Sequence, residues 1–303
     1  MTPETVAAIQ DDLQRIEQQD DLWDDDDFVA RIKALDVLEQ HVLERIENLM
    51  YVHGYRGDLA DLYRRGAHLQ QHLQAINRAL FEQLGETLLA TATPGDALYA
   101  FCEAYVGRAT YATRRPGRDE GYLDVFVNGI MGIEQTPEET IRLQSGMIGY
   151  IPTPACAIFA LLEHAHLNAN DVFYDLGSGL GRVPLLVGLL TAARARGIEI
   201  EPAFYTYAQQ RADALRLRRV AFINCDVRQA DYSDGTLFFM YTPFTGSMLQ
   251  EVLAQLQQLA RQRIIRIAAY GPCTPHVAAQ GWLQATVSQN FEHDALAIFT
   301  SQA

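Results

Sequence analysis

The stretch Val172-Phe-Tyr-Asp-Leu-Gly-Ser-Gly-Leu-Gly-Arg182 decides the fold of this 303-residue chain. A short apolar run ends in Asp175, three glycines follow at alternate positions (Gly177, Gly179 and Gly181), and an apolar helical pattern comes next. This pattern predicts a buried strand, a tight turn and the N-terminus of a helix. Glycine suits such a turn because it lacks a Cβ atom, so it tolerates positive φ angles and lets a ligand approach the backbone.

The spacing of the glycines separates two classes of ligand. The dinucleotide-binding fingerprint reads G-x-G-x-x-G and places a pyrophosphate at the helix N-terminus. Here the glycines read G-x-G-x-G, and the carboxylate of Asp175 precedes them by two positions. A carboxylate repels a pyrophosphate but attracts an ammonium or sulfonium group. The stretch therefore predicts a site for S-adenosylmethionine, with backbone amides and small residues such as Ser178 around its amino-acid end.

Strand and helix patterns alternate from residue 171 onward, which is typical of a parallel α/β sheet. The expected strands are 172–175, 197–201, 220–224, 236–241 and 263–269, and the expected helices are 182–195, 203–218 and 246–260. Two last strands, 283–288 and 295–300, are joined by six residues, too few for a crossover helix, and should form an antiparallel hairpin. We therefore expect an α/β fold with a Rossmann-like methyltransferase sheet, in which parallel strands are closed by a C-terminal antiparallel hairpin.

The first 113 residues predict helices instead. Apolar residues recur with a 3.6-residue period over 32–49 and 59–84, with a turn at 53–57 between them, and a third helix is expected at about 96–107. A composition break at 114–121 indicates a linker. We expect an N-terminal all-α domain, residues 1–120, and an S-adenosylmethionine-binding methyltransferase domain, residues 121–303.

The segment between the linker and residue 171 is less regular. Thr136-Pro-Glu-Glu139 has the signature of a helix start, with Thr as N-cap and Pro at the first helical position. Tyr150-Ile-Pro-Thr-Pro154 predicts a rigid, extended segment, and a helix is expected at about 155–167.

Two glutamates near the end of the second expected strand are candidates for binding ribose. Glu199 comes 24 residues after Asp175, and an acid near this separation commonly accepts hydrogen bonds from both ribose hydroxyls. Because side chains alternate along a strand, Glu199 and Glu201 lie on the same face. Pro202 favours a role for Glu201 in capping the next helix, but the residues alone leave both glutamates open.

Asp226 follows the third expected strand and is placed to accept a hydrogen bond from the exocyclic amine of adenine. Asp231 and Asp234 are rival candidates for the same contact, and an aspartate in a turn also needs no ligand to explain it.

The stretch Met240-Tyr-Thr-Pro-Phe-Thr-Gly246 falls at the carboxyl end of the fourth expected strand, where open α/β sheets bind ligands. We expect Tyr241 to contact the cofactor, and Pro243 and Phe244 to wall a substrate pocket. Methyl transfer is an in-line displacement that needs reacting atoms held about 3–3.5 Å apart. It needs neither a metal nor a covalent enzyme intermediate, so no metal site is expected and no catalytic residue is assigned.

Residues 146–245 resemble the class I S-adenosylmethionine-dependent methyltransferases, and among them the seven-strand protein lysine methyltransferases. These include the non-SET histone lysine methyltransferases and the small enzymes that methylate lysines of mitochondrial carriers and ATP synthase. The resemblance rests on Tyr150–Pro154, on the glycine stretch and on Gly197-Ile-Glu-Ile-Glu-Pro202. It implies contacts with the methionine part from Asp175, Gly177, Gly179 and Gly181, with the ribose from Glu199, with the adenine from Asp226, and with the cofactor from Tyr150 and Thr153.

The stretch Tyr241-Thr-Pro-Phe244 departs from the patterns of related enzymes. It lacks the Asn or Asp that opens the D/N-P-P-Y/F motif of nucleobase amino methyltransferases, which argues against exocyclic amines of DNA as acceptors. It also differs from the Asn-rich version in the histone enzymes, so the acceptor is a protein, with lysine as one option, or a small molecule. A protein that binds the cofactor without catalysis, its pocket blocked by Tyr241–Phe244, is a further alternative.

Composition narrows the partners and the location. The net charge is −14, with nine acids against one arginine in residues 11–27, and nothing forms a basic groove for nucleic acid. The acidic segment is either solvated or docks a basic partner. No apolar run reaches 18 residues, the N-terminus lacks a signal peptide, and four scattered cysteines fit a reducing compartment. We expect a cytoplasmic protein without membrane contact, and the oligomeric state is open.

Overall fold

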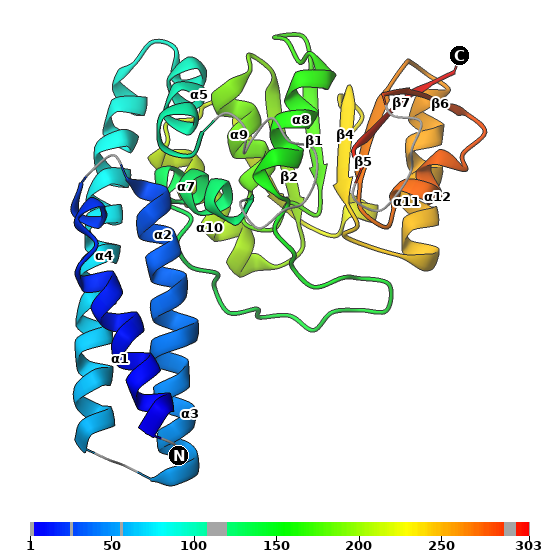
Figure 1. Cartoon of the computed structure of the whole chain (residues 1–303). Helices are drawn as coiled ribbons and strands as arrows, with labels where there is room; N and C mark the ends of the chain where they lie inside the picture. Colours follow the sequence, from blue (N-terminus) through cyan, green and yellow to red (C-terminus); the bar gives the residue numbers. More distant parts are fainter. Residues whose placement is uncertain (1–2, 25–26, 55–56, 108–119, 288–294, 303) are drawn as a thin grey trace. The chain divides into compact units, whose positions relative to one another are not determined.

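The computed structural model describes residues 3–24, 27–54, 57–107, 120–287 and 295–302, which form two compact units (Figure 1). One unit comprises Met1–Thr87 and Ala100–Gly107, and the other comprises Leu88–Tyr99 and Arg108–Ala303. Residues 114–119 of the predicted linker and the connection 289–294 of the predicted hairpin lie outside the described residues.

The first unit is built from helices. Their bounds are α1 Pro3–Glu17, the 3-10 helix η1 Asp20–Trp23, α2 Phe28–Val37, the π-helix η2 Leu38–Leu43, α3 Glu44–His53, α4 Gly57–Ala90 and α5 Pro94–Tyr105, the last two of which extend into both units. The predicted 32–49 helix is thus present as α2, η2 and α3, with helical backbone angles at the junctions. The predicted third helix begins at Pro94 rather than at residue 96.

The core of this unit joins the apolar stripes that the sequence shows, including Leu13, Leu38 and Leu73. It also encloses a charged side chain, Arg31 of α2, which is fully buried. The Arg31 Nε atom donates a hydrogen bond to Asn77 Oδ1 of α4 at 2.8 Å, and its guanidinium also donates to the backbone carbonyl of Asp24.

The second unit contains a seven-stranded sheet with the order β3-β2-β1-β4-β5-β7-β6. The strands are β1 Val172–Leu176, β2 Arg194–Glu199, β3 Val220–Asn224, β4 Leu237–Tyr241, β5 Arg266–Tyr270, β6 Leu283–Val287 and β7 Ala297–Ser301. The first five run parallel, and β7 pairs antiparallel with both β5 and β6. The predicted fold class is therefore confirmed.

Helices accompany this sheet (Figure 1). Their bounds are α7 Glu120–Met131, α8 Ala155–Ala165, α9 Arg182–Leu190, α10 Pro202–Ala214, the 3-10 helix η3 Val227–Gln229, α11 Gly246–Ala260 and α12 Thr274–Ala278. All five residues of β1 are buried, because β2 and β4 pair along its edges and helices cover the faces of the sheet. Because the strand order reverses at β1, whose neighbours are β2 and β4, a ligand is expected at the carboxyl end of this strand.

Several predicted bounds were wrong. The second strand is Arg194–Glu199 rather than 197–201, because Glu201 caps α10 and Pro202 is its first residue. Since Arg194 already pairs in β2, α9 ends at Leu190 instead of continuing to residue 195. The fifth strand starts at Arg266, three residues later than expected.

The predicted helix start at Thr136 was also wrong, because residues 133–154 are not helical. The backbone amides of Thr140 and Ile141, which a helix would bond to its own carbonyls, donate instead to the carboxylate of Glu201. A tertiary contact has therefore overridden the local capping signal. Within the described residues, no helix is long and apolar enough to cross a membrane.

Candidate functional site

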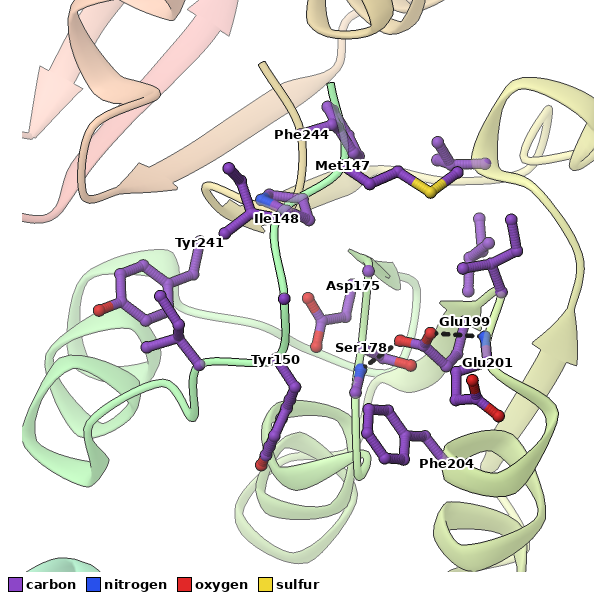
Figure 2. Close-up of a pocket in the computed structure, with 18 of the residues that line it drawn as sticks. Met147, Ile148, Tyr150, Asp175, Ser178, Glu199, Glu201, Phe204, Tyr241 and Phe244 are labelled. Atoms are coloured by element: carbon purple, nitrogen blue, oxygen red, sulfur yellow. Dashed lines mark hydrogen bonds between the residues drawn. The ribbon is translucent and has the colours of Figure 1, made fainter. Parts of the chain in front are cut away.

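A pocket lies at the carboxyl ends of β1, β2 and β4, at the switch point of the sheet (Figure 2). Eleven of the twelve residues predicted for the cofactor and the substrate line it: Tyr150, Thr153, Asp175, Gly177, Ser178, Gly179, Glu199, Asp226, Tyr241, Pro243 and Phe244. Gly181 does not line it. The sequence therefore located the pocket, and the geometry of each side chain shows what it can bind.

The glycine turn has no room for side chains. Gly177 has a φ of +89° and Gly179 a φ of +52°. A Cβ atom on Gly177 would overlap Pro243, and one on Gly179 would overlap the ring of Tyr150, both at well under 3.0 Å. The turn thus packs directly against Pro243 and Tyr150, two residues that also line the pocket.

Gly181 serves packing instead. It has a φ of +80°, and an added Cβ atom would overlap Phe222 of β3 and Ala208 of α10. The third glycine therefore allows the start of α9 to pack closely against its neighbours. The contact with the methionine part that the resemblance implied for Gly181 has no support in its position.

Asp175, the last but one residue of β1, presents a buried carboxylate to the pocket (Figure 2). Its side chain is 3% exposed, and among the described residues burial and the Glu199 carboxylate, but no hydrogen bond, shift its pKa. Burial raises the pKa of Asp175 well above its usual value, and the nearby carboxylate of Glu199 raises it further. A buried carboxylate without a partner is costly, and a cation in the pocket would relieve that cost.

Glu199 ends β2 and lies beside the glycine turn (Figure 2). One oxygen of its carboxylate accepts a hydrogen bond from the Gly179 amide at 2.7 Å, and the other accepts from the Glu201 amide at 2.8 Å. Burial raises the pKa of Glu199, although these amides act in the opposite direction. Each carboxylate oxygen accepts more than one hydrogen bond, so Glu199 retains the capacity to hold ribose hydroxyls.

Glu201 differs from Glu199 because its carboxylate is already fully used. Oε2 accepts from the amides of Thr140 and Ile141, at 2.8 and 3.0 Å, and Oε1 accepts from the Thr140 hydroxyl and the Ala203 amide, at 2.6 and 3.0 Å. Burial alone would raise the pKa of Glu201, but these hydrogen bonds lower it to about 2. Of the two glutamates that the sequence left open, Glu199 is the one with spare acceptor capacity.

Ser178 and Asp226, two further polar residues of the pocket, also differ in their hydrogen bonding. The buried Ser178 hydroxyl oxygen has no hydrogen-bond partner within the described residues, and it packs against Gly197 of β2, where an added Cβ atom would overlap it. The Asp226 carboxylate accepts from the backbone amide and the guanidinium of Arg228, and these hydrogen bonds lower its pKa. Asp226 lines the pocket as predicted, but it shares its carboxylate with a fixed protein partner.

The end of the pocket at β4 is mostly apolar. Tyr241, Pro243 and Phe244 lie there with Met147 and Ile148 of the preceding segment, as Figure 2 shows for the labelled residues. Between them, Thr242 has a φ of +44°, a strained conformation for a β-branched residue and one that tends to occur at functional sites. The Thr242 hydroxyl accepts a hydrogen bond from the Cys273 amide at 3.1 Å, which holds this conformation in place.

Arg182 joins the pocket to α7 and α8. It is 4% exposed, forms an ion pair with Asp124 of α7, and donates to the Thr153 carbonyl at 2.9 Å. Asp124 in turn accepts from the Ala155 amide in the first turn of α8, at 2.9 Å. Arg182, quoted in the sequence stretch without a role, therefore fixes the approach of Tyr150–Pro154 to the pocket.

The sequence missed most of one wall. Residues 139–151 line the pocket through Glu139, Ile141, Leu143, Met147, Ile148, Gly149, Tyr150 and Ile151, of which only Tyr150 was predicted. Phe204 of α10 was also missed, and its ring lies 5.3 Å from that of Tyr150, centroid to centroid. In the sequence, the only sign of this wall was the irregular segment before Tyr150, which contains several apolar residues.

Comparison with known proteins places this pocket in a family context. Residues 153–240 match the family described as "Histone methylation protein DOT1". The match covers β1, β2, β3, nearly all of β4 and the predicted site residues from Thr153 to Asp226. This is the class I S-adenosylmethionine-dependent methyltransferase fold. The resemblance to seven-strand lysine methyltransferases and the predicted cofactor, S-adenosylmethionine, are confirmed by this match.

Individual relatives match only in part. A protein of Dictyostelium discoideum named "Histone-lysine N-methyltransferase, H3 lysine-79 specific" is 28% identical over 114 residues, which are 32% of this chain and 6% of that protein. An RNA methyltransferase from Salinibacter ruber in complex with S-adenosyl-L-homocysteine is 24% identical, covers 50% of this chain and 92% of its own, and has a TM-score of 0.40. A mutant of MtNAS in complex with S-adenosylmethionine is 11% identical, covers 98% of this chain and 97% of its own, and has a TM-score of 0.37. TM-scores this low carry no argument about function.

The residues of the pocket fit this cofactor. The unpaired carboxylate of Asp175 suits the ammonium of the methionine part, and the spare acceptor capacity of Glu199 suits the ribose hydroxyls. The glycine turn, Gly177 to Gly179, lines the same pocket and places its backbone beside the amino-acid end.

Proposed function

We propose that this chain is an S-adenosylmethionine-dependent methyltransferase whose acceptor is the side-chain amine of a protein lysine. The observation that carries the proposal is the buried Asp175 carboxylate, which lacks a partner beside the glycine turn. The family match and the relative named for histone lysine methylation support a lysine acceptor. The match covers only 6% of that relative, so we do not infer that the protein substrate is a histone.

S-adenosylmethionine supplies a methyl group on a sulfonium sulfur, which an uncharged amine nitrogen attacks in line as the carbon–sulfur bond breaks and S-adenosylhomocysteine forms. The protein has to hold both reactants and exclude water, since positioning is the main source of rate in such a displacement. Asp175 and Glu199 orient the donor from β1 and β2. The apolar end at β4 faces the acceptor, and Tyr241, Phe244 and Met147 wall it.

An apolar wall also selects the reactive form of a lysine. Burial in apolar surroundings lowers the pKa of an ammonium, so the amine loses its proton to water before or during entry. The neutral amine nitrogen is the nucleophile that the displacement needs. A small-molecule amine would meet the same wall, and for that reason the small-molecule alternative is a separate outcome of the test below.

The decisive experiment combines binding and transfer. We expect calorimetry to show that the full chain binds S-adenosylhomocysteine, and tritiated S-adenosylmethionine to label a lysate protein on lysine, as located by peptide mass spectrometry. The Asp175→Asn variant should weaken the binding about 10- to 150-fold and reduce the label correspondingly. Label only in the small-molecule fraction would replace the lysine acceptor, and binding with no label in any fraction would favour a catalytically silent protein. No binding at all would refute the site.

The location in the cell is a further part of the proposal. None of the four cysteines (Cys102, Cys156, Cys225 and Cys273), all of which the structure describes, forms a disulfide, which supports a reducing compartment such as the cytoplasm. Immunofluorescence against the native protein in its own host would test this directly.

A further inference from the structure

The segment 133–151, between α7 and α8, lies along the pocket and is attached to the sheet near both of its ends. Towards its C-terminal end, backbone contacts hold it to the residues after β4: the Ile148 amide donates to the Pro243 carbonyl at 3.1 Å, and the Thr245 amide donates to the Gly146 carbonyl at 2.7 Å. Just before its N-terminal end, Tyr207 and Arg211 of α10 donate to the Gly132 carbonyl, at 3.1 and 3.2 Å. Further along, at Thr140 and Ile141, the hydrogen bonds to the segment come from one side chain, that of Glu201 after β2. Leu143 of the pocket wall lies between the attachment at Glu201 and the one after β4, while Ile141 and Met147 line the pocket at these attachments themselves.

Glu201 is more than a helix cap. As the N-cap of α10, it needs one acceptor for the Ala203 amide, a task that serine or asparagine performs equally well. Its other three hydrogen bonds all go to the segment, from the Thr140 amide, the Thr140 hydroxyl and the Ile141 amide. A side chain with two charged oxygens and the reach of glutamate is therefore explained by the segment and not by the helix.

This attachment is directly connected to the predicted ribose contact. The Glu201 amide donates to Glu199 Oε1 at 2.8 Å, while Glu199 Oε2 accepts from the Gly179 amide of the glycine turn at 2.7 Å. A continuous series of hydrogen bonds thus runs from Thr140 through Glu201 and Glu199 to Gly179. Release of the segment at Glu201 would disturb the residue that donates to the ribose-binding carboxylate.

We propose that Glu201 is a positioning residue that latches the 133–151 segment over the cofactor pocket, and that its release sets the rates at which S-adenosylmethionine enters and S-adenosylhomocysteine leaves. The proposal rests on the proposed function of the pocket. In this proposal the carboxylate of Glu201, whose hydrogen bonds are all made within the protein, controls exchange of the ligand from a position two residues after the ribose contact Glu199.

The test uses Glu201→Asn in the full chain, which retains a good N-cap for α10 but is too short to hold the segment. Amide hydrogen exchange reports on the latch itself. Exchange at Thr140 and Ile141 should become at least about tenfold faster, while the Ala203 amide stays protected. Stopped-flow dissociation of S-adenosylhomocysteine should accelerate by a similar factor, roughly tenfold, the effect of losing one charge-assisted hydrogen bond.

Two other variants make the result specific. Thr140→Val removes one hydrogen bond from the segment side without touching α10, so it should accelerate dissociation less, by about 2- to 10-fold. It also keeps the proposal testable if Glu201→Asn does not fold. Glu138→Gln, an exposed residue of the same segment outside the pocket lining, removes a charge without touching the latch and should change neither measurement.

Unchanged exchange at Thr140 and Ile141 in Glu201→Asn would overturn the latch, and faster exchange with unchanged dissociation would overturn its control of the ligand. Failure of the wild-type chain to bind S-adenosylhomocysteine is a different result, because it refutes the proposed function. Hydrogen exchange on the ligand-free chain would still decide in that case whether Glu201 holds the segment.

Discussion

The two units of the molecule each bury a charged side chain, and they treat it in opposite ways. In the helical unit, the fully buried Arg31 donates to Asn77 and to the Asp24 carbonyl, so its guanidinium has partners within the protein and helps to hold the helices together. In the sheet unit, Asp175 is 3% exposed, and no hydrogen bond within the described residues shifts its pKa. A buried charge that is satisfied stabilises a fold, whereas one that is unsatisfied marks a place where something else binds.

The energetic cost of burying the Asp175 carboxylate is reflected in its pKa. Burial, and secondly the carboxylate of Glu199, raise the pKa of Asp175, which means that the folded chain disfavours the charged form. Stability from this group is present at low pH and is lost as pH rises through the raised pKa. The charged form of Asp175 is therefore destabilised in the folded chain, an arrangement that makes sense if a cation occupies the pocket in use.

Removing this charge should have the largest effect on binding. Asp175→Asn keeps the size of the side chain but removes the charge-assisted hydrogen bond to the ammonium, which is worth about 1.5–3 kcal/mol. We expect the affinity for S-adenosylhomocysteine to fall by about 10- to 150-fold in calorimetry. The same variant should unfold at a higher temperature than wild type at pH 7 when no ligand is present. Reduced affinity together with reduced stability would mean that Asp175 is a structural residue like Arg31.

The matching experiment in the helical unit should give the opposite outcome. Asn77→Ala leaves the Nε atom of buried Arg31 without its acceptor and should cost about 1–3 kcal/mol of unfolding free energy. Urea denaturation measures the loss, and calorimetry on the folded variant should give the wild-type affinity for S-adenosylhomocysteine. If affinity falls while stability is unchanged, the contrast between the two buried charges does not hold.

Much of this contrast was predictable from sequence. The fold class followed from the alternation of strands and helices, because the period of the apolar pattern depends on local backbone geometry. Asp175, the glycine turn and Glu199 were found because a strand, a bend and an acid at fixed spacing place their groups at the same edge of a sheet. Gly181 shared the spacing but not the role, since its missing Cβ makes room for Phe222 and Ala208.

What the sequence could not give were contacts between distant segments. The signal at Thr136 predicted a helix, yet Glu201, more than sixty residues later, binds the amides of Thr140 and Ile141. Pro202 hints that Glu201 caps the next helix, but alternation along the strand places Glu199 and Glu201 on the same face, so local sequence leaves both open. Only the position of the 133–151 segment shows that one glutamate is satisfied and the other has acceptor capacity to spare.

The raised pKa of Asp175 makes cofactor affinity depend on pH. A bound ammonium favours the carboxylate, so binding releases a proton wherever free Asp175 is protonated. Affinity should be constant above the raised pKa and should fall about tenfold per pH unit below it. Calorimetry of S-adenosylhomocysteine over a series of pH values, in buffers of different ionisation enthalpy, measures both the slope and the released proton. A flat profile with no proton release would show that Asp175 does not meet the ammonium.

Asp226 should give the smallest effect of the carboxylates in the pocket. Its oxygens already accept from the backbone and guanidinium of Arg228, and these hydrogen bonds lower its pKa, so it does not depend on a ligand as Asp175 does. Asp226→Asn removes at most an ordinary hydrogen bond to the adenine amine, worth about 0.5–1.5 kcal/mol, and should weaken S-adenosylhomocysteine by about 2- to 12-fold. Arg228→Gln is the control, because it frees the Asp226 carboxylate and should leave affinity unchanged or raise it. Suppose instead that Asp226→Asn lowers the affinity as much as Asp175→Asn does. A carboxylate paired within the protein would then matter to the ligand as much as an unpaired one, and the physical basis for distinguishing Asp226 from Asp175 would be removed.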